Sequence, residues 1–192
     1  MPTREVSSDD RMERNSLIRA INLMKPLLER ADRDWCIYGS CALELNGVTS
    51  VEAHDVDIVM SARGARLLSE CLGEPDKADD GSRGGHLPRE EKAEDETGHG
   101  QRFRSLHRKT TVQGIEFDIS GGLEVKTGSG WIPVQINEVR EAGGIRFASL
   151  HDCARLLLLF GRPKDFRRLK ILEEWASRQG ITLPTATTPP RP

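Results

Sequence analysis

Two aspartates with one residue between them, Asp55 and Asp57, open a segment (residues 55–60) in which charged and aliphatic side chains alternate before the segment becomes apolar. On a β-strand, side chains two positions apart point to the same face, about 7 Å apart along the backbone. The two carboxylates therefore converge and repel each other unless a cation neutralises them. Mg²⁺ prefers oxygen ligands and takes one or two carboxylates together with substrate phosphate oxygens. The spacing predicts a magnesium site.

A Gly39-Ser40 pair stands upstream, between the apolar run 35–38 and the helix-forming run 42–45. The start of a helix offers unpaired backbone N–H groups and a positive dipole end, and glycine lets a phosphate approach closely. Ser40 adds a hydroxyl donor. A Gly-Ser pair alone is often only a helix cap, and Asp-x-Asp alone is frequent on solvated strands. Their order along the chain indicates a metal-holding pair beside a phosphate cradle, as nucleotidyl transfer from a nucleoside triphosphate requires.

The run Y-G-S-C-A-L-E-L-N-G-V (residues 38–48) followed by H-D-V-D-I-V (residues 54–59) resembles the G-S-x(n)-D-x-D signature of the polymerase-β-like nucleotidyltransferase superfamily. It is most similar to small bacterial members: the AbiEii/MenT-like toxins, the minimal nucleotidyltransferases paired with HEPN proteins, and antibiotic-modifying enzymes. The resemblance covers residues 35–60, 114–122 and 149–172. It implies an α/β (α+β) nucleotidyltransferase fold, with a mixed, mostly antiparallel sheet backed by helices and a short helical C-terminal segment.

The same resemblance implies a third carboxylate on a neighbouring strand, and residues 115–119 supply acids in an apolar strand context. Asp118 is preferred because its side chain is shorter and it lies nearer the strand end; Glu116 shares its face and is the alternative. In the two-metal scheme of the family, Asp55 and Asp57 bridge both ions, and Asp118 binds the ion that activates the attacking hydroxyl. The implied cofactor is a pair of Mg²⁺ ions, with Mn²⁺ as an alternative.

The C-terminal stretch is similar to the segment after the catalytic sheet in AbiEii-like proteins, where a basic residue reaches the triphosphate. Arg155 takes the place of the lysine often found there, and Arg162 and Lys164 are further candidates. Asp165 contacts the nucleotide or caps the last helix. With Gly39 and Ser40, the resemblance thus implies a nucleotide site that includes Arg155, Lys164 and Asp165.

The implied function is Mg-dependent transfer of a nucleoside monophosphate from an NTP to an acceptor hydroxyl. The leading acceptor is tRNA, and the leading setting is the toxin of a toxin-antitoxin system with a cognate antitoxin. Alternatives are an antibiotic- or protein-modifying transferase and a catalytically silent, nucleotidyltransferase-like antitoxin or binding module. The histidines show neither triad nor metal-ligand spacing. A basic cluster on one predicted strand could contact nucleic-acid phosphates or be a solvated face: Arg102, Arg104, His107, Arg108 and Lys109.

Composition restricts the class of protein. The 192 residues suit one compact domain, with 36% hydrophobic and 30% charged residues. No apolar run approaches the roughly 20 residues that span a bilayer, and residues 1–15 lack the apolar core of a signal peptide, so we expect a cytoplasmic protein without a membrane partner. Residues 1–100 carry 13 Lys+Arg against 21 Asp+Glu, and residues 101–192 carry 15 against 9. The basic second half allows a polyanionic partner.

Local patterns predict the elements that position these residues. We expect a nucleotidyltransferase core over 9–148, a C-terminal helical segment over 149–180 and a disordered tail over 181–192. Within the core, residues 74–100 are rich in Gly and charged residues and predict a long mobile loop, and Gly121-Gly122 predicts a turn. Apolar periodicity predicts helices over 11–31, 40–45, 66–72, 150–160 and 164–178, and strands over 35–38, 55–60, 102–111, 114–120 and 131–136.

Overall fold

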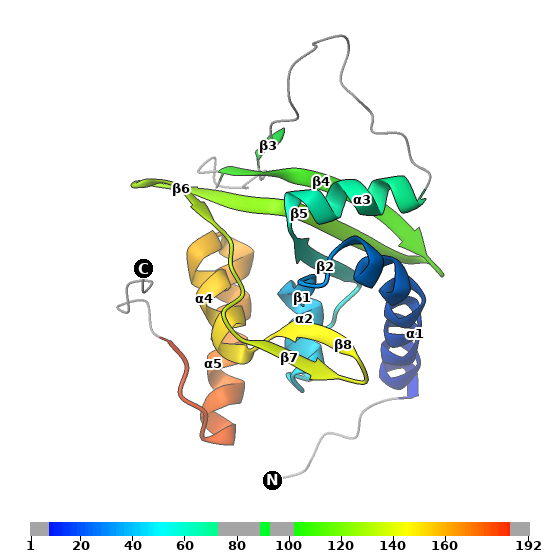
Figure 1. The fold of residues 1–192 in the computed structure, drawn as a ribbon. Coiled ribbons are helices and arrows are strands. Elements are labelled where there is room, and N and C mark those ends of the chain that lie inside the picture. The colour runs from blue at the N-terminus through cyan, green and yellow to red at the C-terminus, as the bar shows by residue number, and fades with distance from the viewer. Residues whose placement is uncertain (1–7, 73–88, 93–101, 185–192) are drawn as a thin grey trace.

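A computed structural model describes residues 8–72, 89–92 and 102–184 (Figure 1). Its helices are α1 (Ser8–Ala31), α2 (Gly39–Leu45), α3 (Ala62–Leu72), α4 (Leu150–Phe160) and α5 (Pro163–Gln179). Its strands are β1 (Cys36–Tyr38), β2 (Asp55–Met60), β3 (Arg89–Lys92), β4 (Arg102–Val112), β5 (Ile115–Thr127), β6 (Gly130–Pro133), β7 (Val139–Ala142) and β8 (Ile145–Ala148).

The strands form one mixed sheet in the order β3-β4-β5-β2-β1-β8-β7, and β6 pairs with β5. β2 lies parallel to β5, and β1 lies parallel to β8. The other pairs, including β1 with β2 and β4 with β5, are antiparallel. The expected fold class, a mixed and mostly antiparallel sheet backed by helices, is confirmed.

Helices cover the sheet from both sides. Successive residues of β5 point to opposite sides of the sheet. Asp118 and Ser120 face a cavity bounded by α4 and α5, whereas Gly121 faces α3. Figure 1 shows α4 and α5 together at one side of the molecule and α1 at the other, with α3 along β4 and β5. One apolar core extends through these layers and includes fully buried Trp35 and Phe117. The core therefore fixes the strand faces on which polar side chains meet.

The glycine pair in β5 corrects one prediction. Instead of ending the strand in a turn, Gly121 and Gly122 lie inside β5, which continues to Thr127. A Cβ on Gly121 would lie 2.4 Å from the Cβ of Ala65, so the absence of a side chain allows α3 to pack directly on the strand. The pairing of β4 with β5 also shifts register between Arg104 and Leu106, as a β-bulge does. The glycines serve helix packing rather than a chain reversal.

The strands in the structure differ from the predicted strands in several other places. β3 lies within the segment predicted as a loop, and the remainder of that segment lies outside the described residues. β7 and β8 were not predicted; they form a hairpin around Gly143-Gly144, both with positive φ (58° and 76°), a conformation that glycine adopts readily. The last predicted strand ends at Pro133 instead of residue 136. The predicted disordered tail lies outside the described residues from residue 185 on.

The two C-terminal helices follow their predicted boundaries. The Ser149 hydroxyl accepts a hydrogen bond from the Asp152 backbone N–H and caps α4, and Gly161 ends the helix in the left-handed conformation. Apolar side chains of both helices, such as Leu156 and Leu172, belong to the same core as the sheet. All four cysteines are free thiols. None of the helices over the described ranges is long and apolar enough to cross a bilayer.

Candidate active site

A cavity of about 340 Å³ opens between the sheet and the two C-terminal helices. Its floor is formed by β2, β4 and β5, and its far wall by α4 and the first turns of α5. Small-molecule sites are concave spaces of this order, lined by apolar groups and a few convergent polar ones. The polar and charged side chains that line it are Tyr38, Asp55, Asp57, Ser105, His107, Lys109, Asp118, Ser120, Arg162, Lys164, Asp165 and Arg168.

Three predicted carboxylates meet in this cavity. Asp55 and Asp57 share one face of β2, and the parallel pairing places Asp118 of β5 beside Asp57 and Glu116 beside Asp55. Neighbouring strands lie about 4.8 Å apart, so Asp57 and Asp118 are close neighbours. Glu116 does not line the cavity; its side chain is 49% exposed and accepts a hydrogen bond from Lys109 at 2.7 Å. The structure thus brings Asp118, rather than Glu116, to the other two acids.

The Asp57 carboxylate is strongly perturbed by its surroundings. Its pKa is raised from 3.8 to about 7, first by burial and then by the negative charges of Asp55 and Asp118. Arg168 and Lys164 act in the opposite direction. A carboxylate in this state binds either a proton or another cation at neutral pH, because the negative charges crowd one another.

Gly39 stands at the junction of β1 and α2 and lines the cavity. Its φ of +70° is in the left-handed region, and a Cβ at this position would lie 2.2 Å from Oδ2 of Asp57. The glycine therefore makes room for the Asp57 carboxylate against the start of α2. Its neighbour Ser40 is buried and does not line the cavity. Of the predicted Gly-Ser pair, the structure places only the glycine at the site.

Asp118 is held by two partners from β4, His107 and Lys109. Nε2 of His107 lies 2.5 Å from Oδ1 of Asp118, and Nζ of Lys109 lies 3.7 Å from its Oδ2. Within the described residues, no group of three or more His, Cys, Asp or Glu side chains is arranged to hold a metal ion as it stands. The donor set nevertheless fits Mg²⁺, because Asp55 and Asp57 supply crowded carboxylate oxygens of the kind it binds together with phosphate.

The wall opposite the carboxylates is basic. Lys164 and Arg168 lie one helical turn apart on α5, line the cavity, and form no hydrogen bond or ion pair with any described residue. The pKa of Lys164 is lowered, first by burial and then by the positive charges of Arg162 and Arg168. Arg168 was missed by the sequence prediction. Lys164 and Arg168 can bind phosphate groups by charge-assisted contacts, and a cation held by the carboxylates opposite would join the same phosphates to the acidic wall.

Asp165 anchors this basic wall. It is fully buried, and its carboxylate accepts two hydrogen bonds from the guanidinium of Arg162, at 2.7 and 3.0 Å. The guanidinium also lies 5.4 Å from the ring centres of Phe103 and Phe160. The Arg162 backbone N–H donates to Asp165 as well, which caps α5. Asp165 thus has the capping function given as one alternative, and it fixes the helix that carries Lys164.

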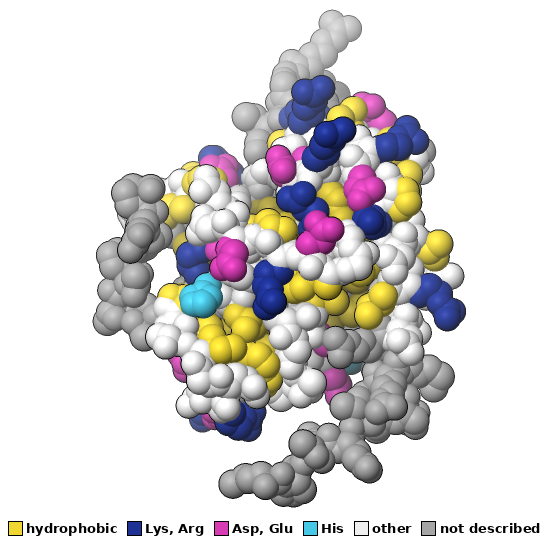
Figure 2. All heavy atoms as spheres, turned by 60° about the horizontal axis from the view of Figure 1, so that its bottom comes forward, with side chains coloured by type: hydrophobic (Ala, Val, Ile, Leu, Met, Phe, Trp, Pro, Cys, Tyr) yellow, Lys and Arg dark blue, Asp and Glu magenta, His cyan; other side chains and the backbone are white. Residues whose placement is uncertain are grey.

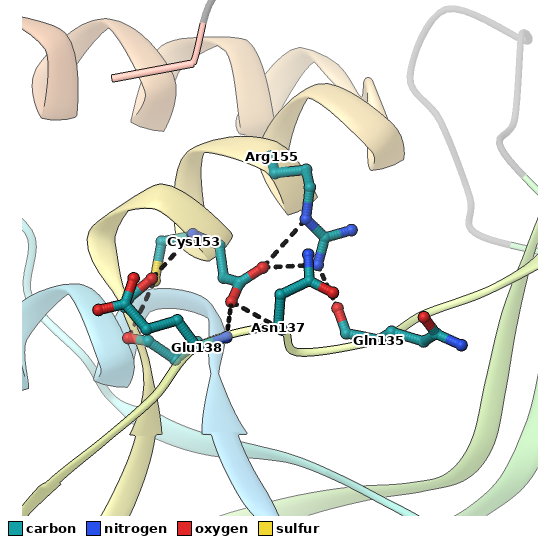
Figure 3. A network of polar contacts seen from close by, with 8 residues as sticks. Gln135, Asn137, Glu138, Cys153 and Arg155 are labelled. Carbon is teal, nitrogen blue, oxygen red and sulfur yellow. Dashed lines mark hydrogen bonds and ion pairs between the residues drawn. The ribbon is translucent and has the colours of Figure 1, made fainter. Parts of the chain in front are cut away.

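Arg155 lies away from the cavity. Its guanidinium donates to Oδ1 of Asp152 at 2.7 and 3.0 Å and also to the backbone carbonyl of Gln135 (Figure 3). The other carboxylate oxygen of Asp152 accepts hydrogen bonds from the backbone N–H groups of Asn137 and Glu138, at 2.9 and 2.7 Å. This network joins α4 to the chain that leads into β7. The structure does not place Arg155 with Gly39, Lys164 and Asp165, the predicted nucleotide-binding residues that line the cavity.

The predicted basic cluster on β4 is divided between two faces of the sheet. His107 and Lys109 line the cavity, whereas Arg108 donates to Oγ of Ser69 in α3, on the opposite face. His107 was not expected at the site, although the two-residue alternation of β4 would have grouped it with Lys109. On the face shown in Figure 2, positive and negative side chains are intermixed rather than gathered by sign.

Comparisons with known proteins support the fold. No protein-family model and no curated protein matches the chain. One similar solved structure is that of a "putative nucleotidyltransferase" from Thermotoga maritima, with 20% sequence identity and a TM-score of 0.52. The similarity covers 84% of this chain and 94% of the other. The chain therefore has a nucleotidyltransferase-like fold.

Proposed function

We propose that this chain is a metal-dependent nucleotidyltransferase, which transfers a nucleoside monophosphate from an NTP to an acceptor hydroxyl and releases pyrophosphate. One observation carries the proposal: inside a nucleotidyltransferase-like fold, the carboxylates of Asp55, Asp57 and Asp118 face Lys164 and Arg168 across a single cavity. Such a cavity accepts a triphosphate with bound cations between an acidic and a basic wall.

The residues take separate roles in this proposal. Asp55 and Asp57 hold Mg²⁺, which when bound neutralises the crowded carboxylates and polarises the phosphoryl group under attack. Lys164 and Arg168 bind triphosphate oxygens and stabilise the charge that develops on the leaving pyrophosphate. Asp118 serves the acceptor hydroxyl, and His107, which contacts Oδ1 of Asp118, positions this carboxylate.

The acceptor in this proposal is tRNA, and the setting is a toxin of a toxin-antitoxin system, controlled by a cognate antitoxin in the cytoplasm. The resemblance of residues 38–48 and 54–59 to AbiEii/MenT-like proteins supports this choice, as does the positive charge of the second half of the chain. An antibiotic, a protein or another small molecule as acceptor is the second proposal, and a silent binding module is the third.

A transfer assay separates these proposals. Purified protein is incubated with each of the four α-³²P-labelled NTPs, Mg²⁺ and total tRNA, and the products are separated on a denaturing gel. The first control is the Asp55→Asn/Asp57→Asn double variant. The second is Asp34→Asn, because Asp34 is an exposed aspartate whose side chain is 92% accessible and does not line the cavity.

Label on tRNA with the wild type and Asp34→Asn, but not with the double variant, supports the proposal and names the nucleotide. Label on the protein or on an added small molecule supports nucleotidyl transfer and overturns tRNA as the acceptor. Equal transfer by the double variant contradicts the assigned site. No label on any acceptor, combined with unchanged cellular function of the double variant, identifies a binding module.

A further inference from the structure

A second, larger cavity of about 1270 Å³ lies apart from the candidate active site and shares no lining residue with it. It is bounded by the last turns of α1, the loop that enters β1, the start of α3 and the β7–β8 hairpin. Neither the resemblance nor the proposed transfer reaction assigns it a role.

Its lining carries more positive than negative side chains. The positive ones are Lys25, Arg30, Arg33, Arg63 and Arg146, and the negative ones are Glu29, Asp32 and Glu141. Lys25 pairs with Glu29 at 3.4 Å. The Asp32 carboxylate accepts hydrogen bonds from the backbone N–H groups of Asp34 and Ser61, at 2.9 and 2.8 Å. The negative side chains thus leave a surplus of arginine charge at the cavity.

Three of the arginines have no partner within the part of the chain that the structure describes. Arg30, Arg33 and Arg63 are exposed, and none of them forms an ion pair or hydrogen bond with a described residue. They come from α1, from the loop after it and from α3, which are separate segments that tertiary packing brings to one cavity. Guanidinium groups present several N–H donors in a fixed plane that suits phosphate oxygens.

Two buried donors in the same lining are also unsatisfied. Nε1 of the fully buried Trp35 and Nε of Arg146 have no hydrogen-bond acceptor among the described residues. A buried tryptophan N–H usually finds a partner, and an unpaired buried donor carries a free-energy penalty of about 1–3 kcal/mol. The charge of Arg146 itself has a partner, because a terminal guanidinium nitrogen lies 3.8 Å from Oδ1 of Asp34. The two N–H groups without an acceptor, in the lining that also carries the three arginines, are a second observation that points to an anionic ligand.

We propose that this cavity binds a ligand with several phosphate groups, held by Arg30, Arg33 and Arg63 over the floor that contains Trp35 and Arg146. The volume exceeds that of the candidate active site severalfold, so the space suits more than one phosphate. The phosphates belong either to an RNA backbone or to a free polyphosphate such as pyrophosphate or ATP. This proposal is independent of the transfer reaction.

The test compares two charge variants of the full chain in EDTA. One is Arg30→Gln/Arg33→Gln/Arg63→Gln, and the matched control replaces three exposed helical arginines outside both cavities by glutamine: Arg19, Arg167 and Arg178. Binding of a fluorescent 20-nucleotide oligo(U) is measured by anisotropy at several salt concentrations, and binding of pyrophosphate and ATP by calorimetry.

The cavity variant should lose binding of at least one of these ligands, whereas the control variant binds as the wild type does. If the ligand is RNA, the slope of log K against log salt concentration should be about 2 smaller in magnitude for the cavity variant than for the wild type. Each single-strand phosphate contact contributes about 0.7 to this slope, and three arginines are replaced. Selective loss of oligo(U) binding identifies an RNA backbone, and selective loss of pyrophosphate and ATP binding identifies a free polyphosphate. Equal binding by both variants overturns the proposal, as does no binding by the wild type.

A second measurement reports on the cavity floor without any variant. ¹⁵N-labelled protein gives one indole N–H resonance for each of its three tryptophans. Titration with the bound ligand should shift the Trp35 resonance and leave those of Trp131 and Trp175 in place, because neither of these lines the second cavity. An unmoved Trp35 resonance at saturating ligand contradicts the proposed site.

Discussion

The substitution Asp57→Asn should stabilise the metal-free protein at pH 8 while it removes nucleotidyl transfer. In the folded chain the pKa of Asp57 is raised from 3.8 to about 7, by burial and by the charges of Asp55 and Asp118. At a pH between 3.8 and about 7, Asp57 has lost its proton in the unfolded chain but still holds it in the folded chain. The free energy of unfolding of the wild type therefore falls as the pH rises through this window.

The size of this effect follows from the two pKa values. A tenfold change in an ionisation constant corresponds to about 1.4 kcal/mol, so the raised pKa of Asp57 destabilises the folded wild type by about 4 kcal/mol once the pH exceeds 7. Asparagine does not ionise and has nearly the same shape. The stability difference between Asp57→Asn and the wild type should thus grow from near zero at pH 4 to about 4 kcal/mol at pH 8.

Urea unfolding in EDTA, followed by circular dichroism at intervals from pH 4 to pH 8, measures this difference directly. Asp34→Asn is the matched control and should show no such growth, because the Asp34 side chain is 92% exposed. At pH 8, Mg²⁺ should stabilise the wild type more than Asp57→Asn, since a bound cation replaces the proton. A difference that stays constant from pH 4 to pH 8 would refute the raised pKa of Asp57, and with it the burial and charge crowding that cause it.

Three further substitutions test separate parts of the site. Gly39→Ala should destabilise the fold in urea and lower label transfer, because its Cβ would lie 2.2 Å from the Asp57 carboxylate; Gly180→Ala, also at positive φ (+69°) but with open space, should retain activity. Arg155→Met should lower the free energy of unfolding by about 2 kcal/mol, since it removes charged hydrogen bonds to buried Asp152, without changing the KM for NTP. Lys164→Met should show the opposite pattern: it should raise the KM for NTP at least about tenfold and leave Tm nearly unchanged. An Arg155→Met effect on KM alone would contradict its structural role.

Much of the candidate site could be predicted from the sequence. The alternation at Asp55 and Asp57 is local and places both carboxylates on one strand face regardless of the rest of the fold. Gly39 was expected at a strand–helix junction from its neighbours alone. For the acid on a later strand, the sequence favours Asp118 by its shorter side chain and its place near the strand end, with Glu116 as the alternative. Both acids stand beside β2, and only the tertiary structure shows that Asp118 lines the cavity whereas Glu116 accepts a hydrogen bond from Lys109 outside it.

The cationic residues show where local signals end. The sequence favours Arg155 as the basic residue that reaches the triphosphate, with Lys164 as a further candidate. In the structure, Arg155 contacts Asp152 and the backbone carbonyl of Gln135, while Lys164 lines the cavity. The Gly121-Gly122 pair has the composition of a turn, but close packing of α3 uses it inside a strand. In both cases the contacts that decide the role of the residue come from segments distant in the chain, whereas a local sequence pattern depends only on residues a few positions away.

The sequence by itself determined the polar faces of single strands and the starts and ends of most helices, because strand alternation and helix capping depend on residues within a few positions. Tertiary structure alone decided which strands lie side by side. The parallel pairing of β2 with β5 brings Asp118 to Asp57, and the packing of α5 on α4 brings Lys164 and Arg168 to face them across the cavity. Burial and charge crowding arise only from those long-range contacts, and they create the chemistry of the site.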